Sequence, residues 1–190
     1  MSNVQFISII YANRNRDVKR IKASINSLSS QQAQNFEVIF VDYGSEPTLV
    51  SQYQNLFTSY DFAQFFHLEV SHLLWNKSKA LNYAIKKATF PNIFIADVDL
   101  IFHPNSLSLL NNLSPSEKFF LFRLGYLSAE ESKKLSENHR FEDLKPQRVG
   151  SVNGMLLASK EALSKVKGLD EFFHFYGAED EDLFARLESA

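Results

Sequence analysis

The feature that most constrains the fold of this chain is an alternation of short apolar runs with amphipathic segments. Apolar runs at residues 4–11, 36–41, 65–70 and 92–96 are separated by stretches in which apolar residues recur at helical spacing. This alternation is typical of βαβ units. The runs are apolar almost throughout, as expected of strands covered on both faces. The sequence therefore predicts an α/β fold with a mostly parallel central sheet flanked by helices.

The second half of the chain is less regular. Residues 119–124 and 149–157 are predicted strands, and residues 159–166 a short helix that ends near Gly168. Between the strands, residues 128–148 are rich in charge and begin with a capping-box pattern, Ser128 with Glu131. A solvated helix and loop is the simple interpretation of this segment, and a mobile lid is the alternative.

The composition excludes several classes of protein. The 190 residues include 20 basic and 22 acidic side chains, which excludes a general nucleic-acid binder, and no cysteine, which excludes disulfides and thiolate metal sites. No apolar run approaches the roughly 20 residues of a membrane-spanning helix, and the first residues lack the order of a signal peptide. We therefore expect a single domain without a membrane span in the cytoplasm, with peripheral association at the inner membrane face left open.

Polar side chains follow three of the predicted strands, at residues 13–16, 42–45 and 97–99. The carboxyl ends of parallel strands lie along one edge of a sheet, where open α/β folds bind their ligands. These segments are therefore expected to form one site.

Asp97 and Asp99 are the first candidates for chemistry at this edge. Two carboxylates two residues apart suit a hard divalent cation, Mn²⁺ or Mg²⁺, although Asp-x-Asp also caps ordinary turns. Cationic side chains next to a strand end or a helix start favour phosphate, with solvated surface charge as the alternative; they are Arg14, Arg16, Lys77 and Lys79. Asp42 can accept from the N–H of a base, or it can form an Asx turn leading into Gly44.

A run of four acidic residues, 179–182, follows Gly177 and an aromatic stretch. One of these carboxylates can serve as a general base; alternatively, the run only complements a helix dipole. Among the remaining aromatic and imidazole groups, Trp75 is either a core residue or a stacking platform. We expect His67 and His72 in turns or on the surface, and His174 packed among phenylalanines.

Taken together, these segments resemble a GT-A-fold glycosyltransferase of the family-2 type. The general pattern appears in Ile7–Tyr11, in residues 37–45 (EVIFVDYGS) and in the Asp-x-Asp. A closer similarity is to the β-1,4-galactosyltransferase group and the galactosyltransferase-like domain of bacterial polysaccharide polymerases. It rests on an ordered set of short motifs along nearly the whole chain: 14–16 (RNR), 75–82 (WNKSKALN), 97–100 (DVDL), 153–160, Gly168 and 176–180 (YGAED).

The resemblance implies roles for individual residues. Arg14, Arg16, Asp42 and Lys77 would hold a uridine diphosphate, Asp97 the ribose or the metal, and Asp99 the metal. Asp180 would be the base that takes the proton of the acceptor hydroxyl, Glu179 would hold the acceptor sugar and Tyr176 would stack on it. Residues 1–100 would form the nucleotide-binding half and residues 101–190 the acceptor half.

The sequence departs from these relatives at three places. Tyr43 replaces a second acid, and Lys77 stands where the close relatives have arginine. The relatives also take a histidine ligand from beyond the Glu-Asp helix, whereas this chain ends inside the corresponding segment at Ala190. Either the metal is held differently, or the chain is part of a longer protein.

The expected function is thus metal-dependent, inverting transfer of a sugar from a UDP-sugar to a hydroxyl of a glycan or oligosaccharide acceptor. Surface polysaccharide synthesis is the expected setting. Two alternatives remain at this point: a noncatalytic sugar-nucleotide or glycan-binding module of the same fold, and a nucleotidyltransferase.

Overall fold

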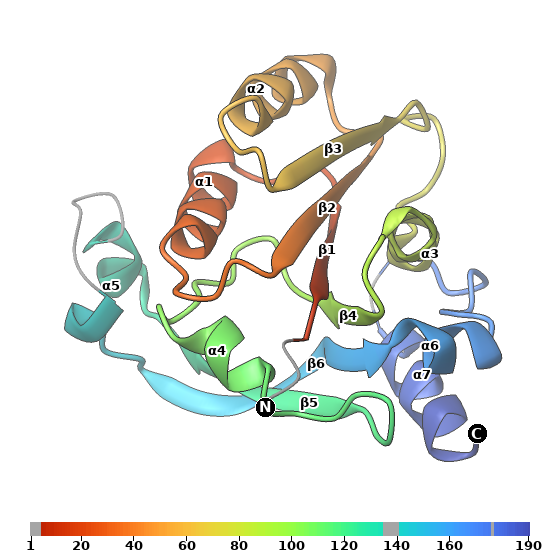
Figure 1. The fold of residues 1–190 in the computed structure, drawn as a ribbon. Coiled ribbons are helices and arrows are strands. Elements are labelled where there is room, and N and C mark those ends of the chain that lie inside the picture. The colour runs from red at the N-terminus through yellow and green to blue at the C-terminus, as the bar shows by residue number, and fades with distance from the viewer. Residues whose placement is uncertain (1–4, 135–140, 176) are drawn as a thin grey trace.

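A mixed sheet runs through the computed structural model, which describes residues 5–134, 141–175 and 177–190 (Figure 1). Within these residues six strands lie in the order β3-β2-β1-β4-β6-β5. The first four are mutually parallel, whereas β6 is antiparallel to both β4 and β5. The strands are β1 (Ile7–Asn13), β2 (Phe36–Tyr43), β3 (Ala63–Leu68), β4 (Asn92–Ile95), β5 (Phe120–Tyr126) and β6 (Arg148–Ser159).

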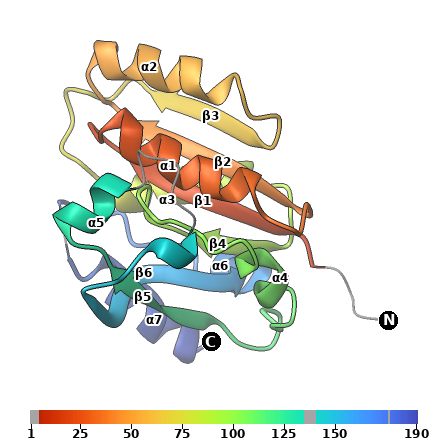
Figure 2. The same cartoon turned by 90° about the vertical axis from the view of Figure 1, so that its left-hand side faces the viewer.

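Helices cover both faces of this sheet (Figures 1 and 2). On one face α1 (Val18–Ser29), α2 (Pro47–Phe57) and α4 (Ser106–Leu110) contribute to one hydrophobic core. On the other, α3 (Lys77–Lys87), α6 (Lys160–Lys165) and α7 (Glu179–Glu188) contribute to a second core. The remaining helical segments, α5 (Ala129–Lys134) and the 3-10 turn η2 (Phe141–Asp143), bury no residue.

Much of the aromatic content is core. Phe40 of β2 packs with its ring centroid 4.7 Å from Phe57 and 6.0 Å from Phe65, and Tyr11 and Tyr53 adjoin it. Alternate residues of each central strand thus fill opposite cores, with Phe40 in one and Ile39 in the other. The expectation that helices cover both faces is confirmed.

The predicted elements are present with shifted bounds. The third strand begins two residues before the predicted start at 65 and ends at Leu68. Helix α4 was not predicted. Ser128 Oγ accepts from the N–H of Glu131 at 3.1 Å, but the Glu131 carboxylate binds Lys134 and the N–H of Lys145, so only half of the capping box forms. Residues 135–140 of the charged segment lie outside the described part of the chain.

Across the described ranges, the structure contains no helix that is both long and apolar enough to span a membrane.

Candidate active site

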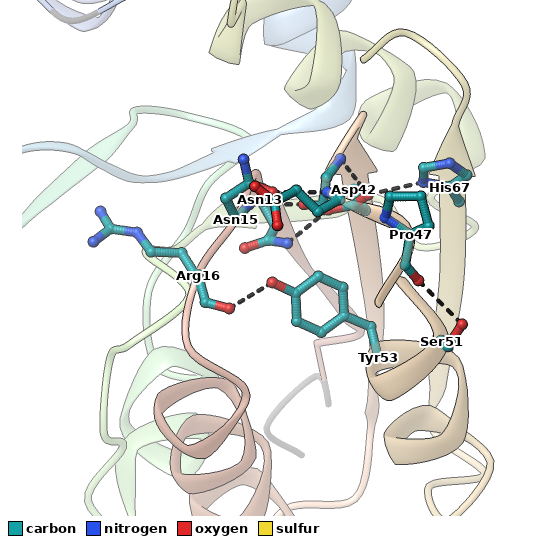
Figure 3. Close-up of polar contacts among 10 residues, drawn as sticks. Asn13, Asn15, Arg16, Asp42, Pro47, Ser51, Tyr53 and His67 are labelled. Atoms are coloured by element: carbon teal, nitrogen blue, oxygen red, sulfur yellow. Dashed lines mark hydrogen bonds and ion pairs between the residues drawn. The ribbon is translucent and has the colours of Figure 1, made fainter. Parts of the chain in front are cut away.

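The ends of β1, β2 and β3 are joined by a buried polar network centred on Asp42 (Figure 3). One oxygen of this carboxylate accepts from Asn13 Nδ2 at 2.7 Å and from the Ser45 hydroxyl. The other accepts from the Ser45 N–H at 3.1 Å and contacts His67 Nδ1 at 2.8 Å. The Asp42 side chain is fully buried. The carboxylate thus closes a local turn over residues 42–45 through Ser45, which is the kind of local structure weighed as the alternative to base binding, and it links the three strand ends.

The expectation for His67 was wrong. It is not a turn or surface residue but a half-buried member of β3, opposite Asp42 in the parallel register. The contact depends on the alignment of two strands that are far apart in sequence, and no short motif encodes such an alignment. The sequence shows only that Asp42 comes directly after the apolar run 36–41 and that His67 lies within the run 65–70.

The loop after β1 is held in place by the same network. Asn15 adopts a positive φ of 55°, donates its N–H to Ser45 Oγ at 2.7 Å and accepts from the Glu46 N–H at 2.9 Å. Asparagine tolerates this left-handed conformation better than most residues. In this loop the Arg16 side chain is exposed, and the main-chain carbonyl of Arg16 accepts a hydrogen bond from the Tyr53 hydroxyl (Figure 3).

Arg14 lies beside this network and holds the loop between β3 and α3. Its guanidinium donates to the carbonyls of Ser71 and Leu73, each at 2.8 Å. The turn after β2 packs closely against the same loop, because a Cβ added at Gly44 would lie 2.6 Å from the Ser71 nitrogen. Arg14 therefore shapes the site, and its proposed contact with phosphate stays a prediction.

Asp97 and Asp99 follow β4 as expected. Burial raises the pKa of the Asp97 carboxyl, Lys77 and Arg16 lower it, and Asp99 and Asp180 raise it. Charges from both halves of the chain therefore act on this carboxyl. Asp99 is exposed and lies 3.4 Å from Arg20. Within the described ranges, no group of three or more His, Cys, Asp or Glu side chains is arranged to hold a metal on its own.

Lys77 connects the two halves directly. It is the first residue of α3, whose end is capped by Asn76 Oδ1 accepting from the Lys79 N–H at 2.8 Å. From there its Nζ reaches Glu179 Oε1 on α7 at 3.2 Å. The predicted cation and the predicted acceptor-binding carboxylate therefore form an ion pair that is mostly shielded from solvent.

The start of α7 is built so that two acidic side chains are buried. Gly177 and Ala178 have positive φ values of 111° and 67°, and the Gly177 N–H donates to Glu179 Oε2 at 3.1 Å. Glu179 and Asp180 are 5% and 7% exposed. Asp180 Oδ1 accepts from the Glu181 N–H at 3.1 Å, and Oδ2 has no hydrogen-bond partner among the described residues. One carboxylate oxygen at the centre of the site thus retains hydrogen-bonding capacity.

Gly154 of β6 forms the floor between these groups. Its φ is +91°, and an added Cβ would lie 2.8 Å from Lys77 Nζ and 3.4 Å from Asp180 Oδ2. Lys77, Asp180 and Gly154 therefore meet within a few ångströms, although they come from α3, α7 and β6.

An aromatic rim adjoins this centre. The N–H of Phe175 donates to the Trp75 carbonyl at 3.1 Å, and the Trp75 ring meets Tyr43 edge-on. Phe172 and Phe175 are exposed. Trp75 is half-buried, so it is neither fully enclosed like a core residue nor fully open like a stacking platform. His174 is exposed rather than packed among the phenylalanines, and Phe175 after it has a positive φ of 67°. Tyr176 lies outside the described residues.

A surface cavity of about 360 Å³ lies elsewhere, beside α7. Its wall includes Asn82 and Arg186, whose hydrogen bonds to Leu169, Val166 and Gly168 serve to hold the loop before α7. We place the site at the strand ends instead, because the charged groups converge there.

Comparison with solved structures gives the same fold. S. aureus TarS, residues 1–349, superposes with a TM-score of 0.69 at 18% identity, over 96% of this chain and 55% of that one. The same fragment in complex with UDP-GlcNAc gives 0.68 at 20% identity, over 96% and 53%. The mannosyltransferase PcManGT from Pyrobaculum calidifontis, in complex with GDP-Man and Mn²⁺, gives 0.62 at 15% identity, over 95% and 51%. The chain thus spans about half the length of these structures.

No curated protein sequence matches the chain. The sequence pattern of glycosyl transferase family 2 matches residues 8–167, which include β1 from its second residue, the five other described strands, the Asp97–Asp99 pair and Lys77. The GT-A fold expected from the sequence is confirmed, and the chain belongs to glycosyl transferase family 2.

Proposed function

We propose that this protein transfers a sugar from a nucleoside diphosphate sugar, a UDP-sugar in the first instance, to a hydroxyl of a glycan or oligosaccharide acceptor. The observation that carries the proposal is the meeting of Asp97, Lys77, Glu179 and Asp180 across the two halves of the chain. A cation for the leaving group and a free carboxylate oxygen for the incoming hydroxyl are what such a transfer requires.

The donor would bind along the ends of β1, β2 and β4 and the start of α3. Arg14, Arg16 and Lys77 are the proposed contacts of the nucleotide diphosphate, and Asp42 is proposed to act at the donor site through the network that it anchors. Residues 1–100 would form the donor half. Lys77 supports this assignment best, because it sits at a helix start with its ammonium group directed into the site. On donor binding, the Lys77 ammonium group would exchange its ion pair with Glu179 for one with the more highly charged diphosphate.

Asp97 and Asp99 are the proposed ligands of Mn²⁺ or Mg²⁺. The donor set fits a cation held jointly with the diphosphate and water, since two carboxylates alone do not complete a site and these ions keep part of their water shell. The raised pKa of Asp97 also fits, because part of it reflects negative charge from Asp99 and Asp180 that a cation would offset. The ion would neutralise charge that develops on the leaving diphosphate.

The acceptor would bind on the side of α7, in the half formed by residues 101–190. Asp180 Oδ2 is the proposed base: it takes the proton as the acceptor oxygen attacks the anomeric carbon. The bond from that carbon to the diphosphate breaks, and the nucleoside diphosphate leaves with the electron pair. Attack from the face opposite the leaving group inverts the configuration. Glu179 would hold the acceptor, and Tyr176 would stack on it together with the exposed aromatic rim.

Surface polysaccharide synthesis in the cytoplasm, at the inner face of the membrane, is the proposed setting, and it rests on the resemblance of the motifs alone. The rival functions differ in what they predict. A noncatalytic module binds the nucleotide sugar without turnover, and a nucleotidyltransferase releases inorganic diphosphate rather than UDP.

The test is calorimetric titration of UDP and GDP with and without Mn²⁺, followed by a panel of UDP- and GDP-sugars assayed for release of free nucleotide. We expect metal-dependent binding and slow hydrolysis of one donor. Asp180→Asn should reduce turnover by about two orders of magnitude or more while leaving nucleotide affinity nearly unchanged, because it removes only the base.

Glu181→Gln is the matched control, since Glu181 is the next residue of α7 and is exposed. It should keep wild-type turnover. Loss of nucleotide affinity in Asp180→Asn would make Asp180 a donor-site residue, and binding that ignores Mn²⁺ would overturn the metal assignment.

A further inference from the structure

The Asp42 carboxylate has no capacity left for a ligand. It accepts hydrogen bonds from Asn13 Nδ2, from the N–H and the hydroxyl of Ser45, and from His67 Nδ1. A carboxylate offers about four acceptor positions, and the side chain is fully buried. A nucleobase therefore cannot reach the residue that the resemblance assigns to it.

His67 provides the open edge of the same network. Asp42 already accepts three hydrogen bonds, so we assign it the acceptor role here as well, and Nδ1 donates to it at 2.8 Å. In the neutral ring this fixes Nε2 as an acceptor. Nε2 has no partner among the described residues, and it is not one of the two buried unpaired atoms found there, Asn13 Oδ1 and Ser78 Oγ. The ring is 22% exposed, which leaves this nitrogen accessible.

We propose that His67 Nε2, oriented by Asp42, is the group that reads the nucleobase of the donor. An acceptor at this point selects a base that carries an N–H on its pairing edge. Uracil has N3–H and guanine has N1–H, whereas cytosine and adenine present a bare ring nitrogen at the corresponding position. Asp42 then acts through His67: it sets the tautomer and the ring orientation, as second-shell carboxylates do for other histidines.

The surroundings of His67 fit this role. The ring sits near the carboxyl end of β3, next to the end of β2 (Figure 3). The loop that follows β3 is held by Arg14, which donates to the carbonyls of Ser71 and Leu73. His67 Nε2, the free acceptor, thus lies between two rigid parts of the structure: the network with four hydrogen bonds at Asp42 and the loop held by two hydrogen bonds from Arg14. A rigid acceptor rejects a base lacking the N–H because its lone pair would be left unsatisfied. The proposal rests on the proposed function, since it names a determinant of that donor site.

The experiment compares UDP, N3-methyl-UDP, GDP and CDP by calorimetry with Mn²⁺ present, using the whole chain. The N3-methyl group removes only the N–H from uracil. The wild type should prefer UDP or GDP to CDP, and should bind UDP about tenfold more tightly than N3-methyl-UDP, the loss expected for one hydrogen bond at a shielded site. His67→Phe should bind UDP and N3-methyl-UDP equally, whereas His67→Gln, which retains an acceptor oxygen, should keep part of the difference.

His72→Phe is the control, because His72 is exposed and lies five residues further along. It should behave as the wild type. ¹⁵N NMR of the His67 ring provides a readout independent of affinity: Nε2 should be unprotonated in the free protein and should shift when UDP binds but not when N3-methyl-UDP binds.

Equal binding of UDP and N3-methyl-UDP by the wild type, or an unchanged preference in a folded His67→Phe, would overturn the assignment of His67. Absence of binding by any of the nucleotides would instead overturn the proposed function, so the two failures are distinguishable.

Discussion

At the scale of single residues, Gly154 is a position where a side chain would displace a charged group of the site. An alanine Cβ would lie 2.8 Å from Lys77 Nζ and would require a φ of +91°. Gly154→Ala should therefore cost roughly 1 to 3 kcal/mol of stability and, by displacing Lys77, weaken UDP binding about tenfold. Calorimetry and thermal melting measure the two effects separately.

Gly150 of the same strand supplies the control. It has no positive φ, and an added Cβ would lie 3.6 Å from the Tyr126 ring, an ordinary contact. Gly150→Ala should leave UDP affinity unchanged. Wild-type affinity in Gly154→Ala would show that the Lys77 ammonium does not need its present position for binding.

Residues next to a strand end or a helix start could be located from sequence, and those linked across strands could not. Asp42, Asp97 and Lys77 could be placed at the predicted edge, because Asp42 is the next-to-last residue of β2, Asp97 comes two residues after β4 and Lys77 begins α3. The Asp42–His67 contact depends on the register of β2 and β3, and the exposure of His174 depends on the course of the loop before α7. Neither property is carried by local composition.

At the scale of elements, β1 packs on α1 through a fully buried tyrosine. The Tyr11 hydroxyl lies 3.2 Å from Ser24 Oγ, and burial raises the pKa of Tyr11. An unfolded tyrosine loses its proton near pH 10, while the folded one retains it. The folded state therefore binds the Tyr11 proton more tightly than the unfolded state does. The contribution of Tyr11 to the free energy of unfolding is fully present below about pH 10 and is lost as the pH rises above it.

Tyr11→Phe tests this dependence. At neutral pH it should cost about 0.5 to 1.5 kcal/mol for the lost hydrogen bond, and above about pH 10 it should lose less stability than the wild type. Urea unfolding at both pH values measures the difference. Tyr83→Phe, at a half-buried residue of α3, is the control for removing a phenol hydroxyl outside the fully buried core. Equal slopes in wild type and Tyr11→Phe would contradict the role of Tyr11.

The same periodic pattern explains which elements could be predicted. Strands β1, β2 and β4 and helices α1 and α3 were predicted because their apolar positions recur with the period of one element and fill one core or the other. Helix α4, only five residues from Ser106 to Leu110, is too short to show a period. The antiparallel direction of β6 depends on the connection before it, which sequence periodicity does not record.

At the scale of the whole molecule, the two halves of the chain bring like charges together at the centre. Asp97 lies in the field of Asp99 and Asp180, with Lys77 and Arg16 as counter-charges, and burial adds to the cost of ionising it. Without a bound ligand, ionisation of Asp97 therefore lowers the free energy of unfolding. Functional sites commonly carry such a cost, which a bound cation and diphosphate offset.

Asp97→Asn should therefore make the empty protein more stable at neutral pH. Because the pKa of Asp97 is raised in the folded state, the wild type loses stability as the pH rises from about 4 through that pKa, and the variant does not. The two proteins should converge below about pH 4, where the carboxyl is protonated in both states. Thermal melting across pH measures this, and each 1 kcal/mol corresponds to roughly 2–4 °C in a chain of this size.

Asp99→Asn separates burial from loss of a surface charge, since Asp99 is exposed and its pair with Arg20 is worth at most about 1 kcal/mol. It should show little gain at neutral pH. Adding Mn²⁺ and UDP should raise the Tm of the wild type and leave that of Asp97→Asn nearly unchanged, because the cation that offsets the charge has lost its buried ligand. An Asp97→Asn protein that is less stable at every pH would show that the carboxylate stabilises the fold, and the charge balance across the two halves would then have to be assigned to other residues.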